Sequence, residues 1–178
     1  MCGIFGIISS KNIGHREFHR LARLSQRRGR DSSGVIAYQD GEYSISRGDF
    51  SIGKLLPLAN LKNSKILMGH TRLITDGEGD NQPVLRDDIA VIHNGIMVDT
   101  KEYWNESSLT RLYDIDTEVI LALTLDHLSA GAPLEELFQH IVDNSKGSYS
   151  CALLLPRLGK LGCVSNKGSL FLGSRDVS

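Results

Sequence analysis

Short apolar runs separated by polar turns dominate the chain, and they predict strands grouped in hairpins and blocks. Asp40-Gly41 lies between two runs rich in β-forming residues, which is typical of a hairpin turn. We expect strands at 4–9, 35–38, 43–46, 66–71, 89–92, 148–155, 161–165 and 170–173. The segment 75–88 is polar and contains glycine, so we expect a loop there.

Apolar residues at helical spacing fall in a few separate stretches. The longest patterns cover 16–28, with Gly29 as a stop, and 116–131. Further helices are expected at 52–58 and at 133–142, where a proline occupies the first turn. Because helices are grouped between blocks of strands, the pattern predicts an α+β fold with mainly antiparallel sheets.

Bulk composition narrows the classes of function. The 178 residues are 40% hydrophobic and 23% charged, as expected for one globular domain. Twenty basic and 21 acidic residues give a net charge of −1, so no nucleic-acid or membrane partner is indicated. Three cysteines without CxxC spacing suggest neither disulfides nor a metal site, and they fit a cytoplasmic location. Phosphate-binding glycine motifs do not occur, and we expect no cofactor.

Cys2 is the first candidate for chemistry, because removal of Met1 would make it N-terminal. Its thiol and a free α-amine would then share one residue. An α-amine has a pKa of about 7.7 to 8, so it is a usable general base for the thiol. Cysteine at position 2 is small enough to permit removal of Met1. Taken alone, however, a buried structural thiol is the simpler interpretation.

Several polar groups follow apolar runs. Arg72 ends one such run, where a guanidinium suits a carboxylate ligand and pairing with an aspartate is equally open. Asn94-Gly95 combines a side-chain amide with an accessible backbone N–H, as in an oxyanion hole, although an isolated tripeptide of this kind is more often a turn. Asp116 opens the long helix, either as an N-cap or as a ligand for an ammonium group.

Two further segments have ordinary structural interpretations when taken singly. Residues 31–34 are typical of a turn preceded by solvated arginines, and residues 81–84 are typical of a proline turn. Together, however, a thiol, an oxyanion pair, an arginine and an aspartate form a complete set for attacking the side-chain amide of a free amino acid. Glutamine is the obvious substrate with that chemistry.

Seven segments in sequence order resemble the class II glutamine amidotransferases, whose glutaminase domains are N-terminal nucleophile hydrolases. They span nearly the whole chain and are MCGIFGI (1–7), QRRGRDSSGV (26–35), GHTRLIT (69–75), NQPV (81–84), HNGIMVD (93–99), DTEVI (116–120) and KGSYSCALL (146–154). The resemblance implies a four-layer αββα sandwich of two mainly antiparallel sheets. It also implies a single glutaminase domain over residues 1–178, which hydrolyses glutamine to glutamate and ammonia.

The resemblance also implies roles for individual residues. Cys2 would be the nucleophile, with its own amine as the base, and Asn94 and Gly95 would form the oxyanion hole. Arg72 would bind the α-carboxylate of glutamine and Asp116 its α-amino group. The remaining implied positions are Arg28, which would help to fix the N-terminal residue, and the pocket-lining Thr75 and Gln82.

Some residues depart from the family pattern, and these departures affect the assignment of the subfamily rather than the proposed chemistry. Leu73 stands where sugar-phosphate aminating members commonly have tryptophan, and Asp76 replaces the histidine of their Thr-His-Gly. DTEVI favours glucosamine-6-phosphate synthase, whereas Arg72-Leu73 with NQPV leans toward asparagine synthetase or amidophosphoribosyltransferase. No acceptor site is identifiable, so we expect a synthase partner chain or domain to receive the ammonia. The alternatives are an N-terminal nucleophile amidase acting on another amide and a silent regulatory module that retains Met1.

Overall fold

Two four-stranded sheets form the centre of the fold in the computed structural model, which describes residues 2–73 and 81–174. Sheet A has the order β1-β4-β2-β3 and sheet B the order β5-β6-β7-β8, and neighbouring strands pair antiparallel throughout the described residues. Their bounds are β1 (Gly3–Ile8), β2 (Ser32–Gln39), β3 (Glu42–Gly48), β4 (Ile66–Arg72), β5 (Val84–Arg86), β6 (Ile89–Val98), β7 (Lys146–Leu155) and β8 (Lys160–Ser165).

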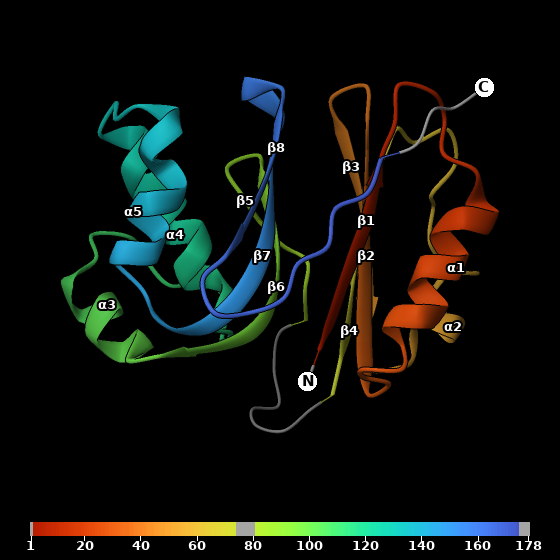
Figure 1. The fold of residues 1–178 in the computed structure, drawn as a ribbon, viewed down its shortest axis with the longest axis horizontal. Helices are drawn as coiled ribbons and strands as arrows, with labels where there is room; N and C mark the ends of the chain where they lie inside the picture. Colours follow the sequence, from red (N-terminus) through yellow and green to blue (C-terminus); the bar gives the residue numbers. More distant parts are fainter. Residues whose placement is uncertain (1, 74–80, 175–178) are drawn as a thin grey trace.

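Helices cover the outer faces of both sheets, which gives the four layers seen in Figure 1. The helices α1 (His15–Ser25) and α2 (Ile52–Leu55) lie on sheet A, while α3 (Thr100–Glu106), α4 (Thr117–Ser129) and α5 (Leu137–Asp143) lie on sheet B. Two short 3-10 turns, η1 (Leu134–Glu136) and η2 (Pro156–Leu158), complete the fold. The expected α+β sandwich of two antiparallel sheets is confirmed. Within the described ranges, no helix combines the length and apolar character needed to cross a membrane.

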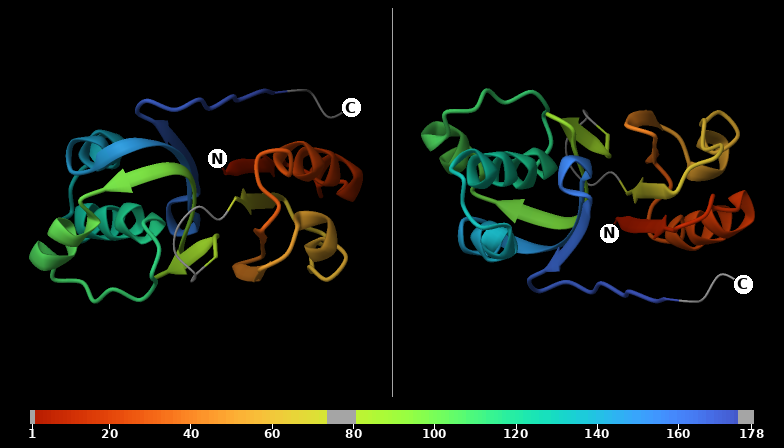
Figure 2. Two further views of the ribbon diagram at one scale, coloured as in Figure 1. Left: turned by 90° about the horizontal axis from the view of Figure 1, so that it is seen from below. Right: turned by 90° about the horizontal axis from the view of Figure 1, so that it is seen from above.

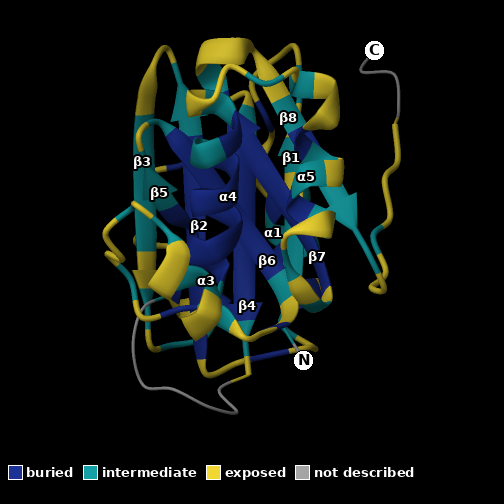
Figure 3. Cartoon of the chain, turned by 90° about the vertical axis from the view of Figure 1, so that its left-hand side faces the viewer, coloured by how far each residue is buried: buried dark blue, intermediate teal, exposed yellow. Residues whose placement is uncertain are grey.

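Successive side chains of each strand point to opposite faces of its sheet. The buried apolar residues therefore form three separate cores. Phe5 and Leu67 pack under α1 and α2, whereas their neighbours Ile4 and Met68 point into the space between the sheets. Figure 3 shows β2, β4, β6 and α4 as the most deeply buried elements. The same alternation therefore decides which polar residues face the inter-sheet space at the strand ends.

Several expectations about individual elements need correction. β6 continues through His93-Asn94-Gly95 to Val98, so this tripeptide lies inside a strand rather than at its end. Ser32 to Gly34 belong to β2 rather than to a turn, because they pair with β3 and β4. Helix α3 and strand β5 were not expected, since each is too short to show a clear period.

The expected strand at 170–173 is wrong. These residues carry no strand pairing in the structure, and Phe171 is 91% exposed. Figure 2 shows the segment running in an extended course from the end of β8 past β1 toward α1. An apolar run predicts a strand only where a partner strand accepts its backbone.

We predict that Gly34→Ala lowers the free energy of unfolding by about 1 to 3 kcal/mol. A Cβ at this position would overlap the carbonyl oxygen of Gln82, which is backbone and cannot turn away. Denaturant unfolding of the variant measures the loss. Gly14→Ala is the matched control, because nothing lies within 4 Å of its added Cβ. Equal stability of the two variants would contradict the close packing at Gly34.

Candidate active site

Sheet A positions Cys2 and Arg72 beside each other. Gly3 pairs with Thr71 at the end of the β1–β4 ladder, so Cys2 and Arg72 come next in the same register. Cys2 shares the face of Ile4, and Arg72 shares the face of Met68, so both point to the inter-sheet side. Both residues are half-buried, which leaves them accessible at this end of the sandwich.

Contacts from the last residue of α1 and from the loop after it hold the start of β1. The Nε of Arg28 donates a hydrogen bond of 2.8 Å to the carbonyl oxygen of Cys2. The Thr71 hydroxyl donates to the carbonyl of Ser25 at 2.9 Å, and a Cβ on Gly3 would overlap the Ser25 hydroxyl. The backbone beside the thiol is thus fixed on two sides.

Sheet B contributes Asn94 and Gly95 from the middle of β6. Asn94 shares the face of Ile92 and points into the space between the sheets, opposite sheet A. Gly95 has φ +148, a conformation that favours glycine, and an added Cβ would meet the backbone of Tyr149 at 2.5 Å. The backbone at Gly95 is exposed, so its polar groups are open to a ligand.

Gln82 connects the two sheets. Its backbone packs against Gly34 of β2, while its side-chain Oε1 accepts a hydrogen bond of 2.5 Å from the backbone N–H of His93. Strand β5 pairs with β6 only as far as Val91, so the side chain of Gln82 takes the place of a ladder partner. Gln82 is buried and holds the strand that carries Asn94.

The chain around Gln82 is held by β3 and the loop behind it. Arg47 Nη1 donates at 2.8 Å to the carbonyl oxygens of both Asn81 and Pro83. The side-chain amide of Asn81 donates to Asp49 Oδ1 at 2.8 Å. These bonds fix residues 81–83 between the sheets, so the proline-turn interpretation misses their role.

Asp116 occupies the N-cap position of α4, but no side-chain capping bond is formed. Its Oδ2 instead accepts a hydrogen bond of 3.1 Å from the backbone N–H of Met97, three residues after Asn94. Its Oδ1 lies 3.6 Å from Nδ1 of His93, and the side chain is 31% exposed. The carboxylate is therefore positioned near the Asn94-Gly95 stretch with part of its surface accessible.

Two buried histidines adjoin the site, although no role was expected for either. His70 on β4 lies between Gly69 and Thr71, and burial first, then His93 and Arg72, lowers its pKa to about 3. Burial also lowers the pKa of His93, and the nearby Asp116 opposes that shift. Both imidazoles are neutral at neutral pH, so the positive charge on this side comes from arginine. The motifs GHTR and HNG contained them, but no spacing rule distinguishes a buried histidine from an exposed one.

The expected site residues thus fall into two facing groups. Sheet A and its loop carry Cys2, Arg28 and Arg72; sheet B and its connections carry Gln82, Asn94, Gly95 and Asp116. Thr75 lies outside the described residues. Ser25, Thr71 and Gly34 are further positioning residues that sequence reasoning missed, since their roles depend on contacts between distant segments.

The other two cysteines lie on strands of sheet B. Cys151 is buried on β7 under the helices, where burial raises the pKa of its thiol. Cys163 on β8 faces the inter-sheet core, and burial raises its pKa as well. In the part of the chain that the structure describes, no three His, Cys, Asp or Glu side chains gather as metal ligands would.

Comparisons with known proteins identify the family of the chain. The sequence model of the glutamine amidotransferase domain family matches residues 70–175. The chain is 32% identical over 199 residues to a glutamine–fructose-6-phosphate aminotransferase [isomerizing] of Agrobacterium fabrum, covering 100% of this chain and 32% of that protein. The corresponding protein of Zymomonas mobilis is 32% identical over 179 residues, covering 95% of this chain and 29% of its own.

The fold is similar to a solved structure as well. The glutamine phosphoribosylpyrophosphate amidotransferase of B. subtilis superimposes with a TM-score of 0.68 at 24% identity. That match covers 86% of this chain and 35% of the solved chain. The chain therefore spans about a third of the length of these relatives.

We predict that His70 makes stability fall as the pH drops below 6.5. The unfolded imidazole takes up a proton with a pKa near 6.5, whereas the folded one stays neutral until about pH 3. Between pH 7 and 5 this group removes about 2 kcal/mol of stability, because the loss of about 1.36 kcal/mol per pH unit begins only near pH 6.5. Denaturant unfolding at both values measures the loss. His70→Gln, which cannot take up that proton, is expected to lose correspondingly less; an unchanged pH dependence would contradict the assignment.

Proposed function

Because the chain belongs to the class II glutamine amidotransferase family, we propose that it hydrolyses glutamine to glutamate and ammonia through a thioester on Cys2. The observation that carries this proposal is the placement of Cys2 and Arg72 opposite Asn94 across the inter-sheet space. A nucleophile, a carboxylate ligand and an amide donor thus converge at one end of the sandwich.

The proposed reaction begins with removal of Met1, which frees the α-amine of Cys2. This amine accepts the thiol proton, and the thiolate attacks the side-chain amide carbon of glutamine. The oxyanion that forms is stabilised by the Asn94 side-chain amide and the Gly95 N–H. The amine returns its proton to the departing ammonia, and water then hydrolyses the glutamyl thioester.

Substrate positioning in this proposal rests on opposite charges. Arg72 binds the α-carboxylate of glutamine through charge-assisted hydrogen bonds. Asp116 binds the α-ammonium group, since its Oδ1 faces no backbone donor in the described residues, whereas Oδ2 accepts from Met97. Gln82 acts by fixing β6 through His93, and Arg28 by fixing the carbonyl of Cys2.

The ammonia is proposed to pass to an acceptor on a partner domain or chain. This inference is supported by the relatives, which are about three times as long as this chain and are named for transfer from glutamine to fructose-6-phosphate. Leu73 and Asp76 depart from the sugar-phosphate pattern, so the proposed transfer does not extend to fructose-6-phosphate as the acceptor.

A glutamine-analogue electrophile is expected to label Cys2 and no other cysteine. Cys151 is buried, and the accessible thiol in the proposed pocket is that of Cys2. Peptide mass spectrometry locates the adduct, and the intact mass reports whether Met1 has been removed. Labelling at Cys151 or Cys163 overturns the mechanism, and retention of Met1 favours the silent module.

Arg72→Ala is expected to raise the KM for glutamine by about 10- to 100-fold, because a charge-assisted pair contributes about 1.5–3 kcal/mol. The change in kcat is expected to be smaller, since the reacting amide lies at the other end of the substrate. Steady-state glutaminase kinetics measure both. Arg23→Ala, an exposed change on α1, is the control. A normal KM in Arg72→Ala would favour an amidase that acts on another amide.

A further inference from the structure

Four arginines of α1 and of the turn that follows it form a stripe along the helix. Arg16, Arg20, Arg23 and Arg27 are three or four residues apart, so they lie one above the other on a single face. This arginine stripe lies opposite the side of α1 that packs on sheet A through the fully buried Phe18. All four arginines are exposed.

The charge of the arginine stripe is not compensated within the described residues. None of the four side chains forms an ion pair or a hydrogen bond with another described residue. Arginines three or four positions apart on a helix repel each other. Their charge also reaches His19, whose pKa is lowered by burial first and then by His15 and Arg23. The guanidinium groups are therefore available to a negatively charged partner.

The positive charge is confined to this side of the molecule. Residues 15–30 contain six arginines and a single acidic residue, Glu17, whereas the whole chain has a net charge of −1. The rest of the chain is therefore net negative, and the helices on sheet B expose acidic side chains that include Glu135, Glu136 and Asp143. That remainder would repel a long polyanion, whereas a short acidic segment could contact the arginine stripe alone.

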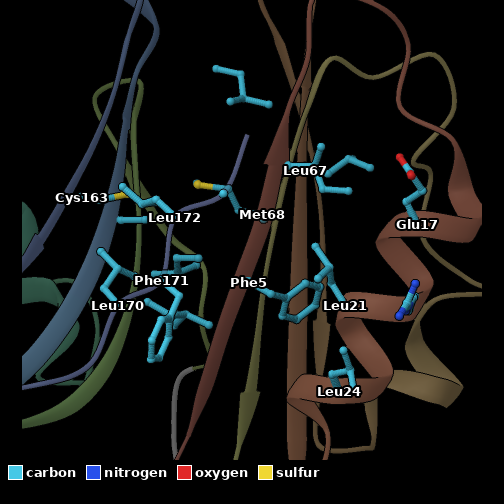
Figure 4. Close-up of a pocket in the computed structure, with 18 of the residues that line it drawn as sticks. Phe5, Glu17, Leu21, Leu24, Leu67, Met68, Cys163, Leu170, Phe171 and Leu172 are labelled. Atoms are coloured by element: carbon cyan, nitrogen blue, oxygen red, sulfur yellow. The ribbon is translucent and has the colours of Figure 1, made fainter. Parts of the chain in front are cut away.

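Exposed apolar side chains adjoin the arginine stripe. The four arginines line a groove of about 1400 Å³ that is also lined by Leu24, Phe171 and Leu172. Leu24 is 47% exposed and Phe171 is 91% exposed. Figure 4 shows Leu24 on α1, with Phe171 and Leu172 on the other side of Phe5. A partner that matches this surface has apolar as well as acidic side chains, which a protein segment supplies and a phosphate backbone does not.

We propose that the arginine stripe binds an acidic amphipathic helix of a partner protein. Glutamates one turn apart on that helix meet the arginines one turn apart on α1, and apolar side chains beside them cover Leu24 and Phe171. The stripe lies on the outer side of sheet A, whereas Cys2 and Arg72 point to the inter-sheet side (Figure 1). Docking therefore leaves the proposed glutamine site open.

Fluorescence anisotropy on the full chain tests the docking with a labelled helical peptide that carries one glutamate per turn and leucines beside them. Arg16→Glu/Arg20→Glu is expected to raise the Kd about tenfold or more, because two attractive pairs become repulsive. Glutamate is favourable in the first turns of a helix, so the fold is retained. Arg16→Gln/Arg20→Gln is expected to raise the Kd less.

The matched control is Lys101→Glu/Lys160→Glu, which makes the same change in net charge at two exposed positions outside the stripe and is expected to leave the Kd unchanged. Absence of peptide binding at low ionic strength overturns the proposal, and so does equal weakening in this control.

Two further outcomes overturn the proposal in favour of another partner. Equal binding of single-stranded DNA, of anionic lipid vesicles or of a peptide with serine in place of leucine would indicate a surface for any polyanion. Dimers in sedimentation velocity that disappear in Arg16→Glu/Arg20→Glu would indicate a second copy of the chain. None of these measurements depends on glutamine turnover, so their result and that for the proposed function are independent.

Discussion

The close approach of Gln82 to Gly34 is the contact on which the arrangement of the two sheets depends. Residues 81–83, which precede β5, lie between them, and Gln82 can approach β2 because Gly34 has no side chain to occupy that space. Once there, Gln82 provides the hydrogen-bond acceptor that β6 lacks beyond β5. A buried N–H without a partner would cost about 1–3 kcal/mol, so this bond stabilises β6 directly beside Asn94.

The two sheets divide the proposed chemistry between them. Sheet A carries the thiol and the guanidinium, and its loop fixes the Cys2 backbone through Arg28. Sheet B carries the amide donor and, at the start of α4, the carboxylate. The thiol comes directly before β1, the guanidinium and the amide lie on β4 and β6, and the carboxylate lies at the start of α4. The backbone of these elements, together with the side-chain bonds of Arg28 and Gln82, therefore sets the spacing.

The sequence alone was sufficient to predict the helices and strands that have a clear hydrophobic period, and to identify the family motifs in their order along the chain. The α1 and α4 patterns, the Asp40-Gly41 hairpin and the antiparallel sheets were all predictable because their signals are local. The continuation of β6 through Gly95 was not predictable, because asparagine followed by glycine is typical of a turn unless a partner strand pairs with them. The contacts of Ser25, Gly34 and Gln82 join distant segments, and one sequence carries no signal for them.

The charge state of His93 affects whether Asp116 can bind the ammonium group of a substrate, as proposed. An imidazolium 3.6 Å away would neutralise the carboxylate and compete with any ammonium ligand. Burial lowers the pKa of His93, with Asp116 opposing, so the ring stays neutral near pH 7. The neutral ring of His93 then does not compete with an ammonium ligand for Asp116. The burial of His93 under α4 is thus a condition for the proposed binding of a substrate ammonium, and the side chain of Thr117, 3.3 Å from Nδ1, helps to keep the ring there.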